Sequence, residues 1–186
     1  VYGSLPPSVK IKESDVSIYR ILNPYAASKL SGELLIYAYN NTYKLKYVVL
    51  RFSNVYGKYD MSNRVIPLWI KRALKNEDLI VYGGDKILDF VYIEDAIEGL
   101  IRVLDNIDNK EVINNVFNIA SGSGVKLVDL AHKIIKLTNS KSKVIVKENR
   151  PGETTKFVAD ISKAQRILKY NPKFDIDKGL RATIQW

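Results

Sequence analysis

Short apolar runs alternate with segments of helical periodicity along the chain, and this alternation limits its fold more than any other feature. The apolar runs have the length of strands and cover residues 47–52, 79–82, 87–92, 116–120 and 144–146. Between them, apolar side chains recur every three or four residues, which is the spacing of an amphipathic helix. Strands that alternate with helices build parallel sheets, so the sequence predicts an α/β fold.

Capping signals mark where several helices begin. Asn23 is a good helix cap, and Pro24 suits the first helical position, where its missing N–H costs nothing. Glu94 and Asp95 open another helix with carboxylates at the positive end of its dipole. Asp160 is expected to cap the last helix. The expected helices cover residues 25–43, 65–75, 94–104, 127–137 and 161–168.

The composition excludes several kinds of chemistry. The chain has 186 residues, no cysteine and one histidine, His132. Without thiols, and with a single imidazole, disulfide frameworks, cysteine nucleophiles, Ser-His-Asp triads and the common metal sites are all disfavoured. We therefore expect no metal and no functional role for His132. Proton transfer is left to Tyr, Lys, Ser, Asp, Glu and Arg side chains.

The net charge indicates an anionic ligand. The chain has 29 Lys and Arg against 20 Asp and Glu, a formal net charge of +9. A basic nucleic-acid-binding domain is one alternative, but the lysines are spread along the chain, and we expect no nucleic acid partner. No apolar run approaches the about 18 to 20 residues of a membrane helix, and the N-terminus lacks the order of a secretion signal. A cytoplasmic protein with no membrane partner is expected.

Tyr25 and Lys29 form the sharpest candidate site. They are four residues apart on the expected helix, so their side chains lie on one face, one turn apart. A tyrosine hydroxyl ordinarily ionises at about pH 10, and a neighbouring ammonium favours the phenolate. Tyr25 can therefore act as a general base, and Lys29 can donate hydrogen bonds to ribose hydroxyls. The same spacing is common on solvated helices, so the surrounding sequence has to decide.

The strand expected over 47–52 leads to a second candidate. Its continuous apolar run is typical of a strand buried on both faces of a parallel sheet. Residues 53–57 follow it and are expected to form a loop. Ligands of open α/β sheets bind beyond the carboxyl ends of the strands, so we expect Asn54 to lie near a ligand.

Several sequence blocks, in a fixed order, resemble the extended short-chain dehydrogenase family of NAD-dependent nucleotide-sugar epimerases and dehydratases. The most specific blocks are Asn23 to Glu33, which includes Tyr25 and Lys29, and Leu50 to Gly57. The resemblance continues almost to the end of the chain. Its other blocks are Val1 to Gly3, Val65 to Pro67, Val81 to Gly83, Asp89 to Asp95, Phe117 to Gly122 and Arg150 to Glu153.

The resemblance implies an architecture and a cofactor. Residues 1–57 would be the second half of a doubly wound, Rossmann-like parallel sheet that binds NAD. Residues 58–186 would be a smaller α/β lobe that binds a nucleotide sugar, with about 88–112 returning to the sheet. The ligand would lie in the cleft between them. The implied partner is a UDP-sugar substrate. Separately, the expected helix over residues 25–39 is broadly apolar, which favours either a homodimer in which it pairs with its copy or packing within the monomer.

The resemblance also assigns catalytic roles. Tyr25 would take the proton from the sugar 4-hydroxyl while the hydrogen on carbon 4 passes to NAD, and Lys29 would hold the nicotinamide ribose. Asn54 would contact the substrate phosphates. Arg150 would pair with the diphosphate, because a planar fork of donors suits phosphate oxygens.

A nucleobase pocket is implied as well. Tyr82 would line it, together with the backbone around Val65 and Ile66. The family often has Arg immediately before the block that begins at Asp89, whereas this chain has Leu88. Arg64 is the candidate to supply that positive charge.

Two family features are absent from this sequence. No glycine-rich NAD motif precedes Tyr25, and Ser4 lies on the wrong side of the Val1 to Gly3 block to be the family's catalytic hydroxyl. The chain begins at Val1 rather than Met, and we expect it to be a piece of a longer protein. On its own it is expected to complete an NAD site but not to form one, and to be inactive.

The reaction step that follows oxidation of the sugar at carbon 4 differs between branches of this family, and residues after Lys29 indicate the branch. Residues 30–33 are more similar to the UDP-glucose 4-epimerase branch, which predicts 4-epimerisation through a transient 4-keto sugar. A 4,6-dehydratase or a decarboxylase of the same family is the alternative. Another alternative is a nucleotide-sugar-binding fragment without turnover.

Overall fold

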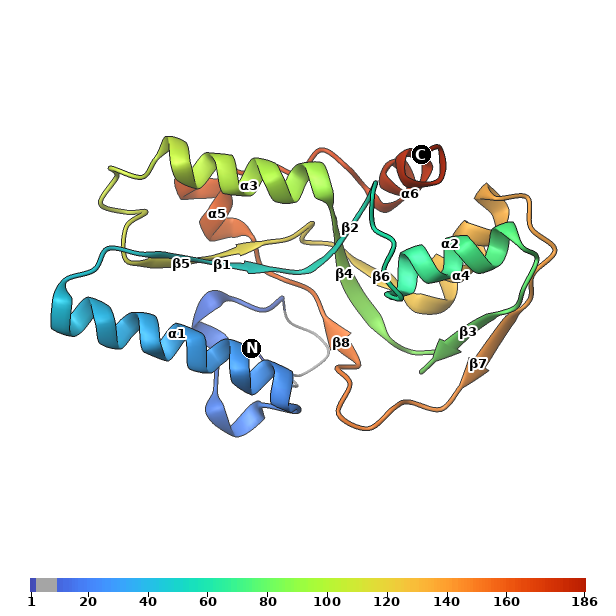
Figure 1. Ribbon diagram of the computed structural model, residues 1–186, viewed down its shortest axis with the longest axis horizontal. Helices are drawn as coiled ribbons and strands as arrows, with labels where there is room; N and C mark the ends of the chain where they lie inside the picture. Colours follow the sequence, from blue (N-terminus) through green and yellow to red (C-terminus); the bar gives the residue numbers. More distant parts are fainter. Residues whose placement is uncertain (3–9) are drawn as a thin grey trace.

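The computed structural model describes residues 1–2 and 10–186, and in this part the chain is an α/β structure (Figure 1). Its strands form three small sheets in which parallel pairs predominate, and helices cover them. The expected α/β class is confirmed. Within the described residues, no helix is both long enough and apolar enough to cross a membrane.

The first part of the molecule is a three-layer arrangement of helix, sheet and helix. A parallel pair of strands forms its middle layer, with Val48 opposite Asn115 at one end of the pair. One helix runs along one side of this pair, and two helices cover the other side (Figure 1). The elements are α1 (Pro24–Tyr43), β1 (Val48–Phe52), α3 (Ile93–Asp105), β5 (Asn115–Ile119) and α5 (Ser162–Leu168). Phe117, Leu168 and Tyr170 are fully buried in its core.

The second part is built around β4 (Ile87–Tyr92), which runs from the second part toward α3 of the first (Figure 1). This strand pairs in parallel with β2 and β8 and antiparallel with β6, while β3 and β7 form a separate parallel pair. The remaining elements are β2 (Asn54–Tyr56), α2 (Val65–Leu74), β3 (Leu79–Tyr82), β6 (Gly124–Lys126), α4 (Leu127–Leu137), β7 (Val144–Lys147), β8 (Lys156–Phe157) and α6 (Ile176–Ile184). Its core contains Trp69, Tyr92 and Leu130.

The capping signals explain where α1 begins and ends. The Asn23 side chain accepts a hydrogen bond from the backbone N–H of Ala26 at 2.9 Å, and Pro24 occupies the first helical position. Lys44 ends the helix in the left-handed conformation, with φ of 59°. Because the first residue of α1 is fixed in this way, the side chains of its first turns have defined positions, and these turns border the candidate site.

Some local expectations were wrong. Residues 53–57 contain strand β2 instead of forming a loop, because β4 offers an edge with which it pairs. β1 is not buried on both faces, since Phe52 is 43% exposed. Asp160 is not the cap of α5, which begins after Ile161; its side chain accepts from the Ser162 N–H at 2.8 Å instead. β6, β8 and α6 are additional elements, as are two 3-10 turns, Glu13–Asp15 and Ile18–Arg20.

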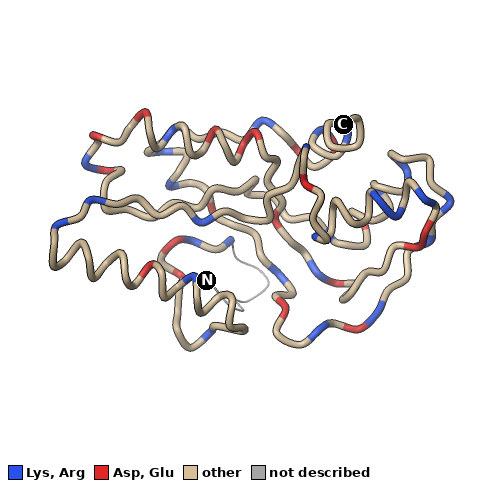
Figure 2. Tube along the Cα trace, in the orientation of Figure 1, with Lys and Arg blue, Asp and Glu red and all other residues tan. Residues whose placement is uncertain are grey.

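Charged side chains are distributed over the chain (Figure 2). Basic and acidic positions are interspersed among uncharged ones, and several basic positions gather at the end of the molecule where β7 lies (Figure 2). α1 exposes large apolar side chains, among them Leu34 and Leu35. The homodimer and the boundaries at residue 57 and around 88–112 stay predictions.

Candidate functional site

Two adjoining cavities lie beside the N-terminal turns of α1. Their volumes are about 510 and 650 Å³, and we call them the first and the second cavity. Both are lined by Tyr25 and Phe52 and by the segment that leads into β8, so they form one continuous depression. Cavities of this size hold small-molecule ligands and cofactors.

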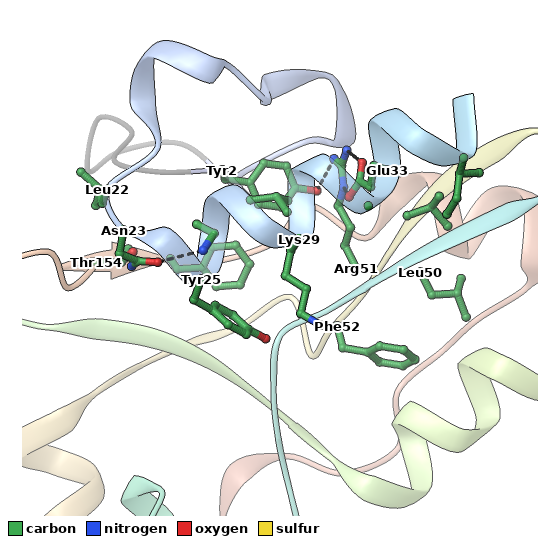
Figure 3. A pocket seen from close by; sticks show the side chains of 16 residues that line it. Tyr2, Leu22, Asn23, Tyr25, Lys29, Glu33, Leu50, Arg51, Phe52 and Thr154 are labelled. Carbon is green, nitrogen blue, oxygen red and sulfur yellow. Dashed lines mark hydrogen bonds and ion pairs between the residues drawn. The ribbon is translucent and has the colours of Figure 1, made fainter. Parts of the chain in front are cut away.

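Tyr25 and Lys29 project from the same face of α1, as their spacing predicts (Figure 3). The Lys29 Nζ lies 5.5 Å from the centroid of the Tyr25 ring, and both side chains point toward Phe52 (Figure 3). Both residues are exposed, and Tyr25 is 71% exposed. Lys29 lines the first cavity, whereas Tyr25 borders both. A phenol and an ammonium therefore meet where the two cavities join.

The second cavity brings together residues that lie far apart in the sequence. Its lining includes five of the residues expected to bind substrate, namely Asn54, Arg64, Val65, Tyr82 and Arg150. They come from β2, from the start of α2, from the end of β3 and from the segment after β7. Ile66 instead lines a smaller adjacent cavity of about 270 Å³, and Ser4 lies outside the described residues.

Arg150 and Tyr82 form a stacked pair in the second cavity. The Arg150 guanidinium carbon lies 3.7 Å from the centroid of the Tyr82 ring. Through hydrogen bonding and its positive charge, Arg150 lowers the pKa of the Tyr82 hydroxyl. The pair presents a flat, cationic surface to the cavity, a shape that suits a planar base or an anionic group.

Asn54 is held at the cavity by the neighbouring strand. Its side-chain amide donates to the backbone carbonyl of Asp89 on β4 at 2.8 Å. The Asp89 carboxylate is fully buried, and it accepts hydrogen bonds from the backbone N–H groups of Ser121, Gly122 and Ala159. Burial raises the pKa of Asp89, and these hydrogen bonds oppose the rise. Asp89 therefore fastens the loop at residues 121–122 and the segment at Ala159 to the strand that carries the site.

Arg64 reaches the second cavity with its charge already paired. Its guanidinium donates to the Asp60 carboxylate at 2.9 Å and to the Ser62 hydroxyl at 3.1 Å. Burial alone would raise the pKa of Asp60, but the hydrogen bonds from Ser62 and the charge of Arg64 outweigh it, so the pKa is lowered. Arg64 is thus less available for a ligand phosphate than an unpaired cation would be.

Lys86 is a cavity residue that the sequence reasoning missed. Its side chain is only 4% exposed, it lines the second cavity, and it forms an ion pair with Glu153. Glu153 is 67 positions away, so no local pattern links the two. Lys86 lies in the turn between β3 and β4, where Gly83 has φ of +81° and a Cβ would overlap the Asn149 side chain. The signal available in the sequence was a lysine in a glycine turn next to Tyr82.

A closed polar network forms part of the wall of the first cavity. Arg51 of β1 and Glu33 of α1 form two hydrogen bonds, of 2.9 and 2.6 Å, and both side chains are 8% exposed. Arg51 also donates to the Tyr2 hydroxyl at 3.0 Å (Figure 3). It donates to the Glu13 carbonyl at 2.8 Å as well. Burial raises the pKa of Tyr2 to about 12. The network holds α1 against β1 and so fixes the wall that carries Tyr25 and Lys29.

Comparisons with known proteins agree with the resemblance seen in the sequence. A model of the "NAD dependent epimerase/dehydratase family" matches residues 1–120. The dTDP-glucose 4,6-dehydratase of Salmonella typhimurium is 31% identical over 202 residues, an alignment that covers all of this chain and 55% of the relative. The chain therefore spans about half the length of such curated relatives.

Solved structures of relatives have the same fold. The UDP-glucuronic acid 4-epimerase of Bacillus cereus, in complex with UDP-glucuronic acid and NAD, superposes with a TM-score of 0.91 at 31% identity, over all of this chain and 57% of that one. The dTDP-glucose 4,6-dehydratase DesIV of Streptomyces venezuelae, also with NAD bound, gives 0.89 at 29% identity, over all of this chain and 56% of the other. The chain belongs to the NAD-dependent epimerase/dehydratase family.

Proposed function

We propose that the whole protein is an NAD-dependent nucleotide-sugar 4-epimerase in which Tyr25 is the catalytic base. The main support is the meeting of Tyr25 and Lys29 at the junction of two cavities, the second of which is lined by Tyr82 and Arg150. One cavity would then take the reactive end of the cofactor and the other the nucleotide sugar. A UDP-sugar is the proposed substrate.

The residues at the first cavity fit one end of NAD. Lys29 is exposed to this cavity and carries three donors, which match the two hydroxyls of a ribose. Lys29 would therefore hold the ribose next to the nicotinamide. NAD held there would supply the acceptor, and later the donor, of the hydride of sugar carbon 4.

Tyr25 carries the proton chemistry of this proposal. Its phenolate oxygen takes the proton of the 4-hydroxyl as carbon 4 becomes a ketone, and it returns that proton when the alcohol forms again. Rotation of the ketone between the two transfers exchanges the faces of carbon 4 and yields the 4-epimer.

The second cavity would bind the nucleotide through its charge and its aromatic ring. The Arg150–Tyr82 pair suits the diphosphate and the base, and Asn54 lines the same cavity as this pair and Tyr25. Residues 30–33 support an epimerase, as argued from the sequence. The cytoplasmic setting and the homodimer belong to the same proposal.

Substitution of Tyr25 in the whole protein tests the proposed reaction. Tyr25→Phe should lower kcat by about 10² to 10⁴-fold, because positioned base catalysis contributes that much, while the affinity for the UDP-sugar stays nearly unchanged. Tyr39→Phe is the matched control, since Tyr39 lies on the same helix, is 53% exposed and lines neither cavity. Normal turnover in Tyr25→Phe would refute the role of this tyrosine.

Analysis of the product separates the members of the family. A 4-epimer supports the proposal, whereas a 4-keto-6-deoxy sugar would identify a 4,6-dehydratase instead. For the 186-residue chain by itself, we propose binding of the nucleotide sugar without turnover. Calorimetry with a UDP-sugar measures the binding, and any turnover with added NAD would overturn the expected inactivity.

A further inference from the structure

The charges on the second cavity are unbalanced. Among the described residues that line it, Arg64, Lys86 and Arg150 are basic, and Glu153 is the one acid. The lining therefore has an excess of positive charge. A diphosphate group carries at least two negative charges, so it complements this excess better than a neutral ligand does.

Lys86 is the cation that cannot turn away from the cavity. Its backbone is fixed on both sides, because its N–H donates to the Gly83 carbonyl at 3.2 Å and its carbonyl accepts from the Leu127 N–H at 2.9 Å. Its side chain is 4% exposed, compared with 57% for Arg150 and 63% for Arg64. A buried ammonium needs a partner of opposite charge, since desolvation penalises an isolated charge strongly.

Glu153 is this partner, but its single negative charge does not neutralise all of the positive charge around it. The carboxylate contacts Lys86, and its other oxygen lies 3.8 Å from the Arg150 guanidinium. One carboxylate is thus shared by two cations. Because Glu153 is 42% exposed, it can rotate toward water when another anion arrives, whereas Lys86 cannot. Glu153 therefore has the position of a displaceable counter-ion.

Apart from Arg150, the described neighbouring positions offer no free cation in place of Lys86. Leu88 also lines the second cavity and offers no charge, and Arg64 is already bonded to Asp60. We propose that Lys86 binds the diphosphate of the nucleotide sugar and that Glu153 occupies its place until the ligand arrives. This inference rests on the proposed function, because it names the residues by which the same cavity selects its ligand.

Calorimetric titration with UDP and with uridine tests the inference, since the two probes differ only in the diphosphate. Lys86→Gln should weaken UDP binding by about tenfold or more, which is typical of a lost charge-assisted contact, and should leave uridine binding within about twofold. Glu153→Gln should strengthen UDP binding by about three- to tenfold, because the competing carboxylate is gone. Lys86→Arg should retain most of the affinity.

The control is Lys141→Gln, which removes the same charge from an exposed site that lines neither cavity. Lys141→Gln should bind UDP like the wild type. If its UDP affinity fell as much as that of Lys86→Gln, the change in net charge alone would explain the loss of affinity. Circular dichroism melting verifies that each variant folds. If Lys86→Gln does not fold, Lys86→Arg and Glu153→Gln still decide the question.

The possible outcomes separate the two proposals. Failure of the wild type to bind UDP would refute the nucleotide-sugar function itself. UDP binding that is unaltered by Lys86→Gln would leave that function standing and overturn the role of Lys86. A fall in UDP affinity in Glu153→Gln would show that Glu153 supports the ligand and is not displaced by it.

Discussion

Two ion pairs of this protein differ in how much of each is closed off from solvent. The Arg51–Glu33 pair lines the first cavity, but both of its side chains are only 8% exposed, and the guanidinium has further acceptors on Tyr2 and Glu13. In the Lys86–Glu153 pair the lysine is 4% exposed, but the glutamate is 42% exposed and faces a cavity. The first pair is complete without a ligand, whereas the second has one partner that can leave.

This difference separates a structural role from a binding role more clearly than charge or burial alone. A pair whose partners are both enclosed contributes to the assembly of the fold, and removal of one member leaves an uncompensated charge in the interior. A pair that is enclosed on one side only can exchange its exposed member for a ligand anion. The following predictions test this distinction, beginning with the largest expected effect.

Loss of Glu33 should be the most damaging of these changes. Glu33→Gln leaves the Arg51 guanidinium buried without its carboxylate, and we expect the free energy of unfolding to fall by about 3 to 5 kcal/mol. Urea unfolding measures this free energy. Glu98→Gln is the control, since Glu98 forms an i,i+4 pair with Arg102 in which the side chains are 28% and 40% exposed, and it should cost less than about 1 kcal/mol. Equal losses in the two variants would contradict the distinction.

Loss of Glu153 should cost less and should respond to ligand. Glu153→Gln leaves Lys86 without its partner, but the cavity admits water to that side, so we expect a loss of about 1 to 2 kcal/mol. Added UDP should raise the melting temperature of this variant more than that of the wild type, because the ligand replaces the missing charge. In Glu33→Gln, UDP should raise the melting temperature no more than it does in the wild type. An identical UDP-induced shift in Glu153→Gln and wild type would argue against a displaceable counter-ion.

The pair of Arg64 and Asp60, in which the arginine is 63% exposed and the aspartate 13%, should give the smallest effect, and one that depends on pH. The folded-state pKa of Asp60 is lowered, so its carboxylate stabilises the fold above its ordinary value of about 4, and this contribution is lost as the pH falls through the lower folded-state value. Asp60→Asn should therefore lower the melting temperature slightly at pH 7. The difference from wild type should shrink at pH 3, and a difference that grows in acid would show the opposite linkage.

The sequence predicts those parts of the molecule that depend on local rules. Asn23 and Pro24 fix the start of α1, and the four-residue spacing of Tyr25 and Lys29 is enough to place them on one face. The α/β class follows from the alternation of short apolar runs with segments of helical periodicity. These features rest on the backbone geometry of one helix or one strand, so distant residues do not alter them.

The remaining features depend on contacts between distant segments. β6 and β8 have three and two residues, and they exist as strands because β4 offers them edges. The Lys86–Glu153 pair joins segments that no spacing rule connects. α6 was predictable in principle, because Asp175 caps it by accepting from the Lys178 N–H at 2.8 Å.

The turn that carries Lys86 also restricts which sequences this site tolerates. At Gly83 the backbone is left-handed, and the space where a side chain would begin is filled by Asn149, from the same segment as Arg150 and Glu153. A branched or bulky residue would strain the turn. It would also push the segment that carries Arg150 and Glu153 away from Lys86. A saturation library at position 83, sorted for nucleotide capture, should therefore return glycine almost alone, while a library at the exposed position 85 should return most amino acids.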